Sequence, residues 1–139
     1  MKIFMILAVC IAVASAGVVD HTRCGGVGTF LEMRIQNCEG AIAYMNPGTP
    51  YPSEGDLIPS SAAPALRLKV TATYLGFPIS IIDTVLDNSS VQPGNLYTIR
   101  FTITPSDGLK GNTVPVDAEI SNEASGIIEI CVRVQAHIN

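Results

Sequence analysis

Residues 66–74 read LRLKVTATY, and apolar side chains occupy every second position of this stretch. Successive side chains of a β-strand point to opposite faces, so the pattern predicts a strand with one dry and one wet face. Residues 97–103 (YTIRFTI) and 128–136 (IEICVRVQA) alternate in the same way, and residues 114–120 (VPVDAEI) alternate more weakly. Residues 27–35 are predicted to form a further strand.

Turn-forming residues gather between these stretches, at residues 46–48, 92–95, 106–108, 110–112 and 125–126. No segment shows a helical period. About seven short strands separated by turns predict an all-β fold, namely an immunoglobulin-like antiparallel β-sandwich. The segment Tyr51–Pro64 contains three prolines and few apolar residues. We expect it to be an edge strand, where proline interrupts no hydrogen-bonded ladder.

The N-terminus has the layout of a secretory signal peptide. Residues 1–16 read MKIFMILAVCIAVASA, with one Lys, an apolar run and small residues at the end. The alternative is a membrane anchor, but the uncharged run Ile3–Val19 falls just short of the roughly 20 residues that a spanning helix needs. We therefore expect residues 17–139 to form one secreted domain that is extracellular, with the endosomal or lysosomal lumen as the alternative location.

Composition excludes several classes of function. The net charge of −4 and the pI near 4.9 argue against nucleic-acid binding, which requires concentrated Lys and Arg. The sequence has no nucleophile elbow, phosphate-binding loop or His-Glu-x-x-His motif, so an enzyme is not expected. It has no Cys-x-x-Cys pair, and His21 and His137 are isolated, so we expect neither a metal site nor a cofactor.

Export would leave three cysteines, because Cys10 lies in the signal peptide. An odd number allows one disulfide and a free thiol, or an intermolecular pair. A bond between Cys24 and Cys131 would close a loop of about 100 residues and stabilise the fold by roughly 4–5 kcal/mol in the chain-entropy model. That argument favours this pair over those involving Cys38 without excluding them.

Asn88-Ser89-Ser90 is an N-glycosylation sequon between two predicted strands. The triplet also occurs often by chance. Glycosylation of Asn88 would require its loop to face solvent.

The dry faces of the strands permit two interpretations. They could interdigitate as a filled core, as in any β-sandwich, or enclose an apolar cavity that holds a ligand. The segment Leu75–Ile82 is apolar, is broken by Gly and Pro at a strand end, and continues into a loop. An exposed apolar loop beside a sandwich edge is typical of the mouth of a binding site. Residues 25–28 (GGVG) are interpreted as a flexible lead-in to a strand.

Six motifs, in order and with matching spacings, resemble one family over the whole of residues 17–139. They are Val19-Asp20 with Cys24-Gly25, Cys38, Gly48-x-x-Tyr51, Leu75-Gly76-Phe77-Pro78, Leu96-Tyr97-Thr98-Ile99 and Ile130-Cys131-Val132. The family is the ML lipid-recognition domain, which includes the Niemann–Pick C-type sterol carriers and the mite group 2 allergens.

The resemblance implies a secreted, non-enzymatic two-sheet sandwich that holds one lipid in an apolar tunnel between its sheets. It also implies a Cys24–Cys131 disulfide. Members usually carry three disulfides, but here the partner expected for Cys38 aligns with Ala43, and the small-loop pair expected around Leu86–Ser90 is absent. We therefore expect an unpaired Cys38 and a looser loop around Asn88.

Carried over by position, the mouth of the tunnel falls near Leu57, Ile81 and Leu109, and Ile79, Phe101 and Ile103 lie deeper. The remaining predicted lipid-binding residues are Leu68, Val70, Phe77, Ile99 and Val132. The expected partners are a sterol, a fatty acid or a phospholipid, with transient contact to a membrane or another carrier. The alternative function is a secreted immunoglobulin-like module that binds a protein partner, with an innate-immune or signalling role.

Overall fold

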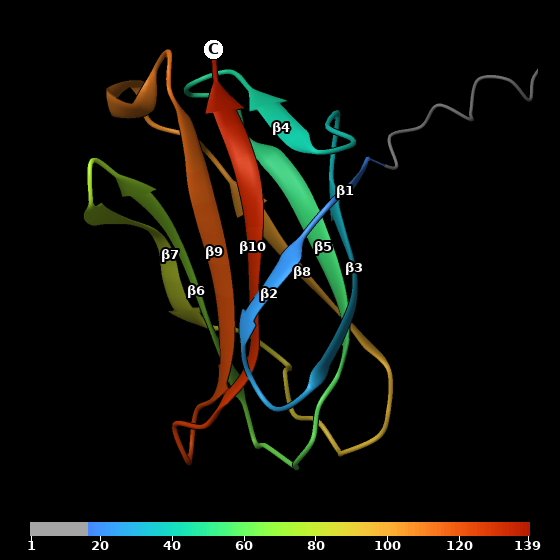
Figure 1. The fold of residues 1–139 in the computed structure, drawn as a ribbon. Coiled ribbons are helices and arrows are strands. Elements are labelled where there is room, and N and C mark those ends of the chain that lie inside the picture. Colours follow the sequence, from blue (N-terminus) through green and yellow to red (C-terminus); the bar gives the residue numbers. More distant parts are fainter. Residues whose placement is uncertain (1–16) are drawn as a thin grey trace, which may run out of the picture.

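The computed structural model describes residues 17–139 as two β-sheets packed face to face (Figure 1). The first sheet has the strand order β1 (Val18–Val19), β3 (Thr29–Ile35), β5 (Tyr51–Ile58), β8 (Tyr97–Ile103). The second has the order β2 (Thr22–Gly25), β10 (Ile128–Ile138), β9 (Thr113–Asn122), β6 (Leu66–Tyr74), β7 (Phe77–Val85), and β4 (Ile42–Met45) pairs with β10. A 3₁₀ helix, η1 (Asp107–Leu109), lies between β8 and β9. The all-β, immunoglobulin-like sandwich is confirmed.

Strand pairing is antiparallel throughout, except that β4 runs parallel to β10. The two strands predicted from the clearest alternation, β6 and β8, have the predicted bounds. Leu66, Leu68, Val70 and Ala72 of β6 are all buried, as expected for its dry face. Period-two hydrophobicity therefore determines which face of each of these strands forms the core.

The prediction for Tyr51–Pro64 is wrong, because β5 is an inner strand paired with β3 on one side and β8 on the other. Its inward positions include Ser53 and Gly55, so the dry face does not stand out in the sequence. The ring of Phe30 lies against Gly55, and a Cβ at residue 55 would come within 2.8 Å of Phe30 Cε1. The close approach of this ring therefore favours glycine at position 55.

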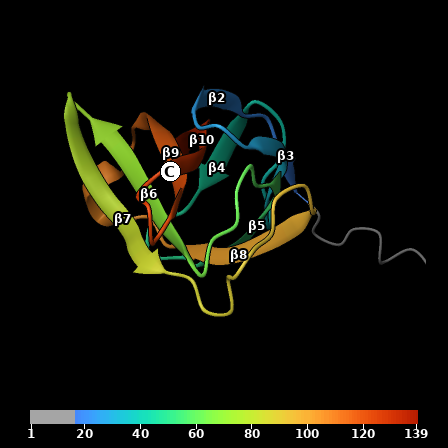
Figure 2. The same cartoon turned by 90° about the horizontal axis from the view of Figure 1, so that it is seen from below.

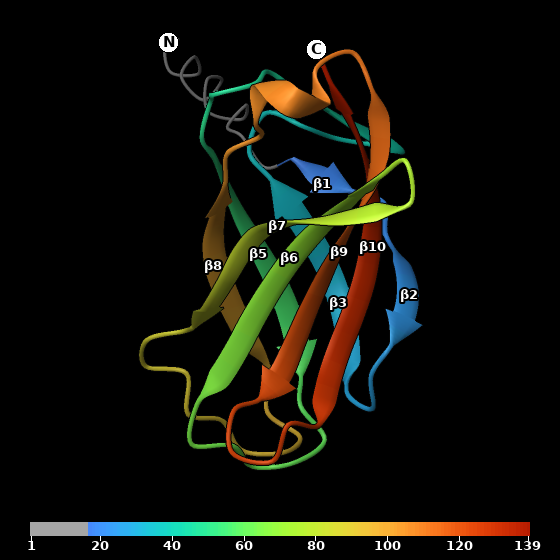
Figure 3. The same cartoon turned by 90° about the vertical axis from the view of Figure 1, so that its left-hand side faces the viewer.

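The segment after β6 is a hairpin and does not run into a loop as predicted. Leu75 and Gly76 both have positive φ (52° and 82°), the conformation of a tight two-residue turn, and β7 returns along β6. Figure 3 shows this hairpin at the edge of the second sheet. Ser80 pairs with Thr71 and Ile82 with Val70, so Ile81 is the extra residue of a β-bulge.

The position of Glu129 also differs from the expectation. Alternation predicted that its side chain lies on the wet face of β10, but Glu129 is only 1% exposed. Ile128 pairs with Ser121 and Ile130 with Ile120, which leaves Glu129 as an extra residue. Residues 25–28 lead into β3 as interpreted, and they also lie close to the backbone of β10. Gly28 donates a 2.8 Å hydrogen bond to the Glu129 carbonyl, and a Cβ at Gly26 would lie 2.4 Å from that same oxygen.

Cys24 and Cys131 form a disulfide between β2 and β10, so this pairing is confirmed. Cys38 is a buried free thiol, as expected from the Ala at position 43, and its Sγ lies 3.6 Å from the Tyr44 carbonyl oxygen. The predicted signal peptide, residues 1–16, lies outside the described residues. Within residues 17–139, no helix is long and apolar enough to cross a membrane.

Candidate functional site

An apolar cavity lies between the two sheets, in the half of the sandwich that η1 and β4 cover. Its fifteen lining residues come from seven strands, η1 and the loop before it, and none has a polar side chain. They are Met33, Ile35, Met45, Val70, Ile81, Phe101, Ile103, Pro105, Leu109, Val114, Val116, Ala118, Val134, Ala136 and Ile138. Such a wall offers a ligand dispersion contacts and no hydrogen bond.

The cavity is narrow in this structure. The centre of a water-sized sphere can occupy about 20 Å³ of it, which is room for about one water molecule. A hydrocarbon chain can therefore enter only if the walls move apart. The two methionines of the lining, Met33 and Met45, are unbranched and flexible, so they can repack around a guest at low cost.

The exposed edge of the cavity lies on the side bounded by β7 and β8. Most of the lining is buried, but Ile81 on β7, Phe101 on β8 and Val116 on β9 are each half-buried. Viewed from below, β7 and β8 are the edge strands of their sheets and bound the same side of the molecule (Figure 2). Among the described residues β7 is hydrogen-bonded to β6 alone and β8 to β5 alone, so each of these two walls is held by a single neighbouring strand.

Five of the predicted lipid-binding residues line the cavity, namely Val70, Ile81, Phe101, Ile103 and Leu109. Leu57, Leu68, Ile99 and Val132 are buried in the core outside it, and Ile79 packs half-buried against that core.

The residues predicted at the mouth and the predicted lipid-binding residue Phe77 lie elsewhere than expected. Leu57 and Leu109 are fully buried and so do not lie at a mouth, because β5 is an inner strand and η1 folds Leu109 inward. Phe77 is 70% exposed at the end of the hairpin and lies outside the cavity.

Sequence reasoning missed Met33 and Met45. Met33 lies on β3, where a bulge at Leu31 interrupts the alternation, and Met45 ends the four-residue strand β4. Strands this short or irregular give no readable period. The lining residues of β9 and β10 belong to dry faces that the sequence did indicate.

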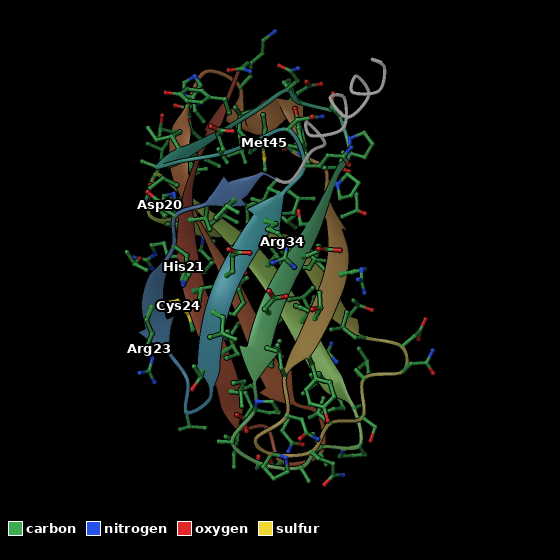
Figure 4. All side chains as sticks on the ribbon, turned by 90° about the vertical axis from the view of Figure 1, so that its right-hand side faces the viewer. Asp20, His21, Arg23, Cys24, Arg34 and Met45 are labelled. Atoms are coloured by element: carbon green, nitrogen blue, oxygen red, sulfur yellow. A yellow bond between two sulfur atoms is a disulfide. The ribbon has the colours of Figure 1, made fainter. Side chains whose placement is uncertain are left out.

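The charged groups lie elsewhere. On the outer face of the first sheet, Arg34 contacts Glu32 at 2.7 Å, Asp56 at 2.8 Å and Glu54 at 3.0 Å (Figure 4). Hydrogen bonding from Arg34 lowers the pKa of Asp56 to about 2, although desolvation opposes the shift. The same contacts, above all that with Asp56, raise the pKa of Arg34. This charged cluster ties β3 to β5 on the face that points away from the cavity.

Glu129 is a buried carboxylate at the opposite end of the sandwich. Its Oε1 accepts a 2.8 Å hydrogen bond from the Ser60 backbone N–H, and its Oε2 accepts bonds from the hydroxyls of Ser60 (2.9 Å) and Ser61 (2.7 Å). Burial by itself would raise the pKa of Glu129, but these donors outweigh it and the pKa is lowered. The carboxylate is buried and its three hydrogen bonds tie β10 to the loop after β5, so we assign it a structural role.

Asn88 is exposed in the loop between β7 and β8, as a glycosylation site would have to be. The part of the chain that the structure describes brings together no group of three or more His, Cys, Asp or Glu side chains that could hold a metal ion.

Neither a family model nor a curated protein sequence matches the chain. Solved structures do match its fold. A Niemann–Pick type C2 protein from Japanese carpenter ant aligns with a TM-score of 0.72 and 16% identity, over 86% of this chain and 99% of that one. Chicken MD-1, complexed with lipid IVa, aligns with a TM-score of 0.58 and 14% identity, over 83% and 85%. The C-terminal domain of Wzt aligns with a TM-score of 0.59 and 13% identity, over 86% and 77%.

The fold is therefore an ML-like β-sandwich. The resemblance to the ML domain, stated from short motifs, is confirmed at the level of the fold.

Proposed function

We propose that this protein is a secreted lipid carrier that holds one sterol, fatty acid or similar lipid between its sheets and exchanges it with membranes or other carriers. One observation carries the proposal: the interior cavity is lined by fifteen residues without a single polar side chain. The fold similarity to chicken MD-1, which was solved with lipid IVa, supports it. No catalytic step is included.

Uptake requires the wall to move, because the cavity is nearly closed without a ligand. Burying about sixteen methylenes would contribute roughly 13 kcal/mol gross, at about 0.8 kcal/mol for each CH₂. Part of this burial free energy offsets the cost of separating β7 from β8. The net free energy of binding is therefore much smaller than the gross value. A membrane solvates the same chain about equally well, so exchange between the two is close to balanced.

The β6–β7 hairpin is the part we propose to touch the membrane. Leu75 is 77% exposed and Phe77 is 70% exposed, and no charged residue lies between Ala72 and Ile82. Ile79 and Ile81 continue the apolar row from Phe77 towards the cavity. A lipid could follow this row without crossing polar surface.

Secretion is supported by the signal-peptide pattern of residues 1–16 and by the Cys24–Cys131 disulfide, which persists only in oxidising compartments. In that compartment Asn88 is available for glycosylation. Mass spectrometry of the secreted protein before and after removal of N-linked sugars tests this, with Ser90→Ala as the variant that should show no shift.

A second candidate function is an immunoglobulin-like module that binds a protein partner. The narrowness of the cavity favours it, since a filled interior is all that such a module needs. Under this alternative the exposed apolar residues of the hairpin would contact a protein.

Replacing Ile81 by Asp separates the two functions. A charge at the half-buried edge of the cavity should abolish binding of a fluorescent fatty acid or sterol, whereas Ile128→Asp, an equal change at an exposed position outside the cavity, should not. Thermal unfolding of both variants checks that they fold. The lipid-carrier proposal fails if the purified secreted protein contains no extractable lipid and the wild type binds neither probe.

A further inference from the structure

A second hollow lies between the free edges of the two sheets, next to the apolar cavity. It is an open groove of about 510 Å³. Buried core residues are among those lining it, including Leu66, Val91 and Ile99, while Thr84, Asp87, Asn88, Ser90 and Arg100 supply polar groups. Unlike the cavity, the groove is both large and polar on its walls.

The groove and the cavity follow each other along the same two strands. On β8, Phe101 and Ile103 line the cavity and residues 97–100 line the groove. On β7, Ile81 lines the cavity and residues 84–85 line the groove. At about 3.3 Å per strand residue, the two hollows are centred about 12 Å apart. An amphipathic molecule could therefore lie across both, with its tail at Ile81 and Phe101.

The polar groups of the groove have hydrogen-bonding capacity to spare. Arg100 donates from Nε to Glu54 at 2.9 Å, and its other guanidinium nitrogens have no partner within the described residues. The side chains of Asp87 and Ser90 likewise have no hydrogen-bond partner there. The Arg100 side chain is 71% exposed, so it is free to turn over the edge strand β8 towards a ligand in the groove.

The charges of the groove disfavour an anionic ligand. Arg100 is the single cation among the lining residues, Asp87 is the single carboxylate, and Glu54, which pairs with Arg100, lies outside the lining. A fatty-acid carboxylate would have to compete with Glu54 for Arg100 and would be repelled by both acids. Uncharged hydroxyls can instead donate to the carboxylate of Asp87 and accept from Arg100 and Ser90.

We propose that this groove binds an uncharged, hydroxyl-bearing headgroup of a single-chain lipid whose tail occupies the apolar cavity. A single chain needs the smallest separation of the sheets. This inference rests on the proposed lipid-carrier function and specifies its ligand class, an acyl ester of a polyol.

The test compares two neutral oleoyl esters, 1-oleoylglycerol, whose headgroup carries two free hydroxyls, and methyl oleate, which has none, with oleate as the anionic third. Displacement of a fluorescent fatty acid measures each affinity. Because Asn88 lines the same groove, the secreted protein is measured before and after its N-linked sugars are trimmed. We expect 1-oleoylglycerol to bind about tenfold more tightly than methyl oleate and than oleate, as two modest hydrogen bonds would give.

Arg100→Ala should reduce the preference for 1-oleoylglycerol over methyl oleate to less than threefold and leave the methyl oleate affinity unchanged. Arg133→Ala, an exposed arginine that pairs with Asp117 in the other sheet, should keep the full preference. Equal binding of the two esters by the wild type, or a preference that survives Arg100→Ala, would overturn the groove proposal while leaving the carrier intact. Failure of all three oleoyl ligands to bind would also overturn the groove proposal, and the carrier itself falls if a fluorescent sterol does not bind either.

Discussion

The two ends of the sandwich interior are held by different kinds of interaction. At the end away from η1, Glu129 accepts three hydrogen bonds from Ser60 and Ser61, and the Cys24–Cys131 disulfide joins β2 to β10 nearby. Asn122 adds a 3.1 Å bond from its amide to the Ala62 carbonyl. At the other end, around the cavity, the side chains that face one another are all apolar.

This difference bears on function because directional and non-directional contacts respond differently to strain. Breaking a buried hydrogen bond leaves unsatisfied groups and is costly, whereas apolar walls can part when another apolar surface replaces the lost contacts. We therefore expect the Glu129 end to stay fixed and the cavity end to open. The predictions below test that asymmetry.

The largest effect is expected from removing the disulfide. In the double variant Cys24→Ser, Cys131→Ser, the loss of a cross-link over 107 residues should lower the free energy of unfolding by roughly 4–5 kcal/mol, measured by urea denaturation. The lining of the cavity is unchanged, so the folded fraction should still bind lipid. A loss of lipid binding that exceeds the loss of folded protein would contradict the separation of the two ends.

Glu129→Ala should come next, at about 3 kcal/mol, because it removes a buried carboxylate that accepts three hydrogen bonds from Ser60 and Ser61. Glu119→Ala on the neighbouring strand β9 removes a carboxylate without recorded hydrogen bonds and serves as the control, with a change within about 0.5 kcal/mol. Equal losses in the two variants would show that the Glu129 end is not fixed by its hydrogen bonds.

The burial of Glu129 is also a feature that the sequence pattern did not predict. Alternation with period two predicted β6 and β8 and the buried faces of β9 and β10, because one residue in two must face the core. It failed at Glu129, where a bulge inserts one residue and shifts the pattern. No residue type marks a bulge in advance. It failed at β5 because an inward glycine makes room for Phe30, a contact distant in sequence.

The candidate site was predictable in kind and less so in detail. Val70, Phe101 and Ile103 lie on clear strands and do line the cavity. Leu109 was expected at a mouth and is buried, since the sequence gives no hint of η1 folding over the end. The width of the cavity depends on how closely two sheets approach, which is set by the packing of all the facing side chains together.

Acid should weaken the wall that the charged cluster supports. Asp56 has its pKa lowered to about 2 by Arg34, so its contribution to stability is complete above the unfolded pKa near 4 and is lost as the pH falls towards 2. Asp56→Asn should cost about 2 kcal/mol at pH 7 and flatten the dependence of stability on pH between 4 and 2.

Asp87→Asn is the control, because Asp87 is exposed and lies outside the charged cluster. The stability of this variant should depend on pH in the same way as that of the wild type. Urea denaturation at a series of pH values gives both curves. If the Asp56→Asn curve is as steep as that of the wild type, the acid sensitivity lies elsewhere, for example at Glu129, whose pKa is also lowered.

The smallest effect, and the most direct measure of the asymmetry, is the reactivity of Cys38. Its thiol is buried in the segment that leads from β3 into β4, and burial raises its pKa, so a thiol reagent at pH 8 should label the native protein slowly. If the cavity end opens by itself, labelling at low urea will be independent of urea, the mark of a local opening that exposes little surface. Leu109→Ala, which loosens the lining, should speed this phase more than Glu129→Ala does. A rate that rises with urea from the outset, in parallel with global unfolding, would mean that both ends open together and that the cavity cannot admit a guest without unfolding the protein.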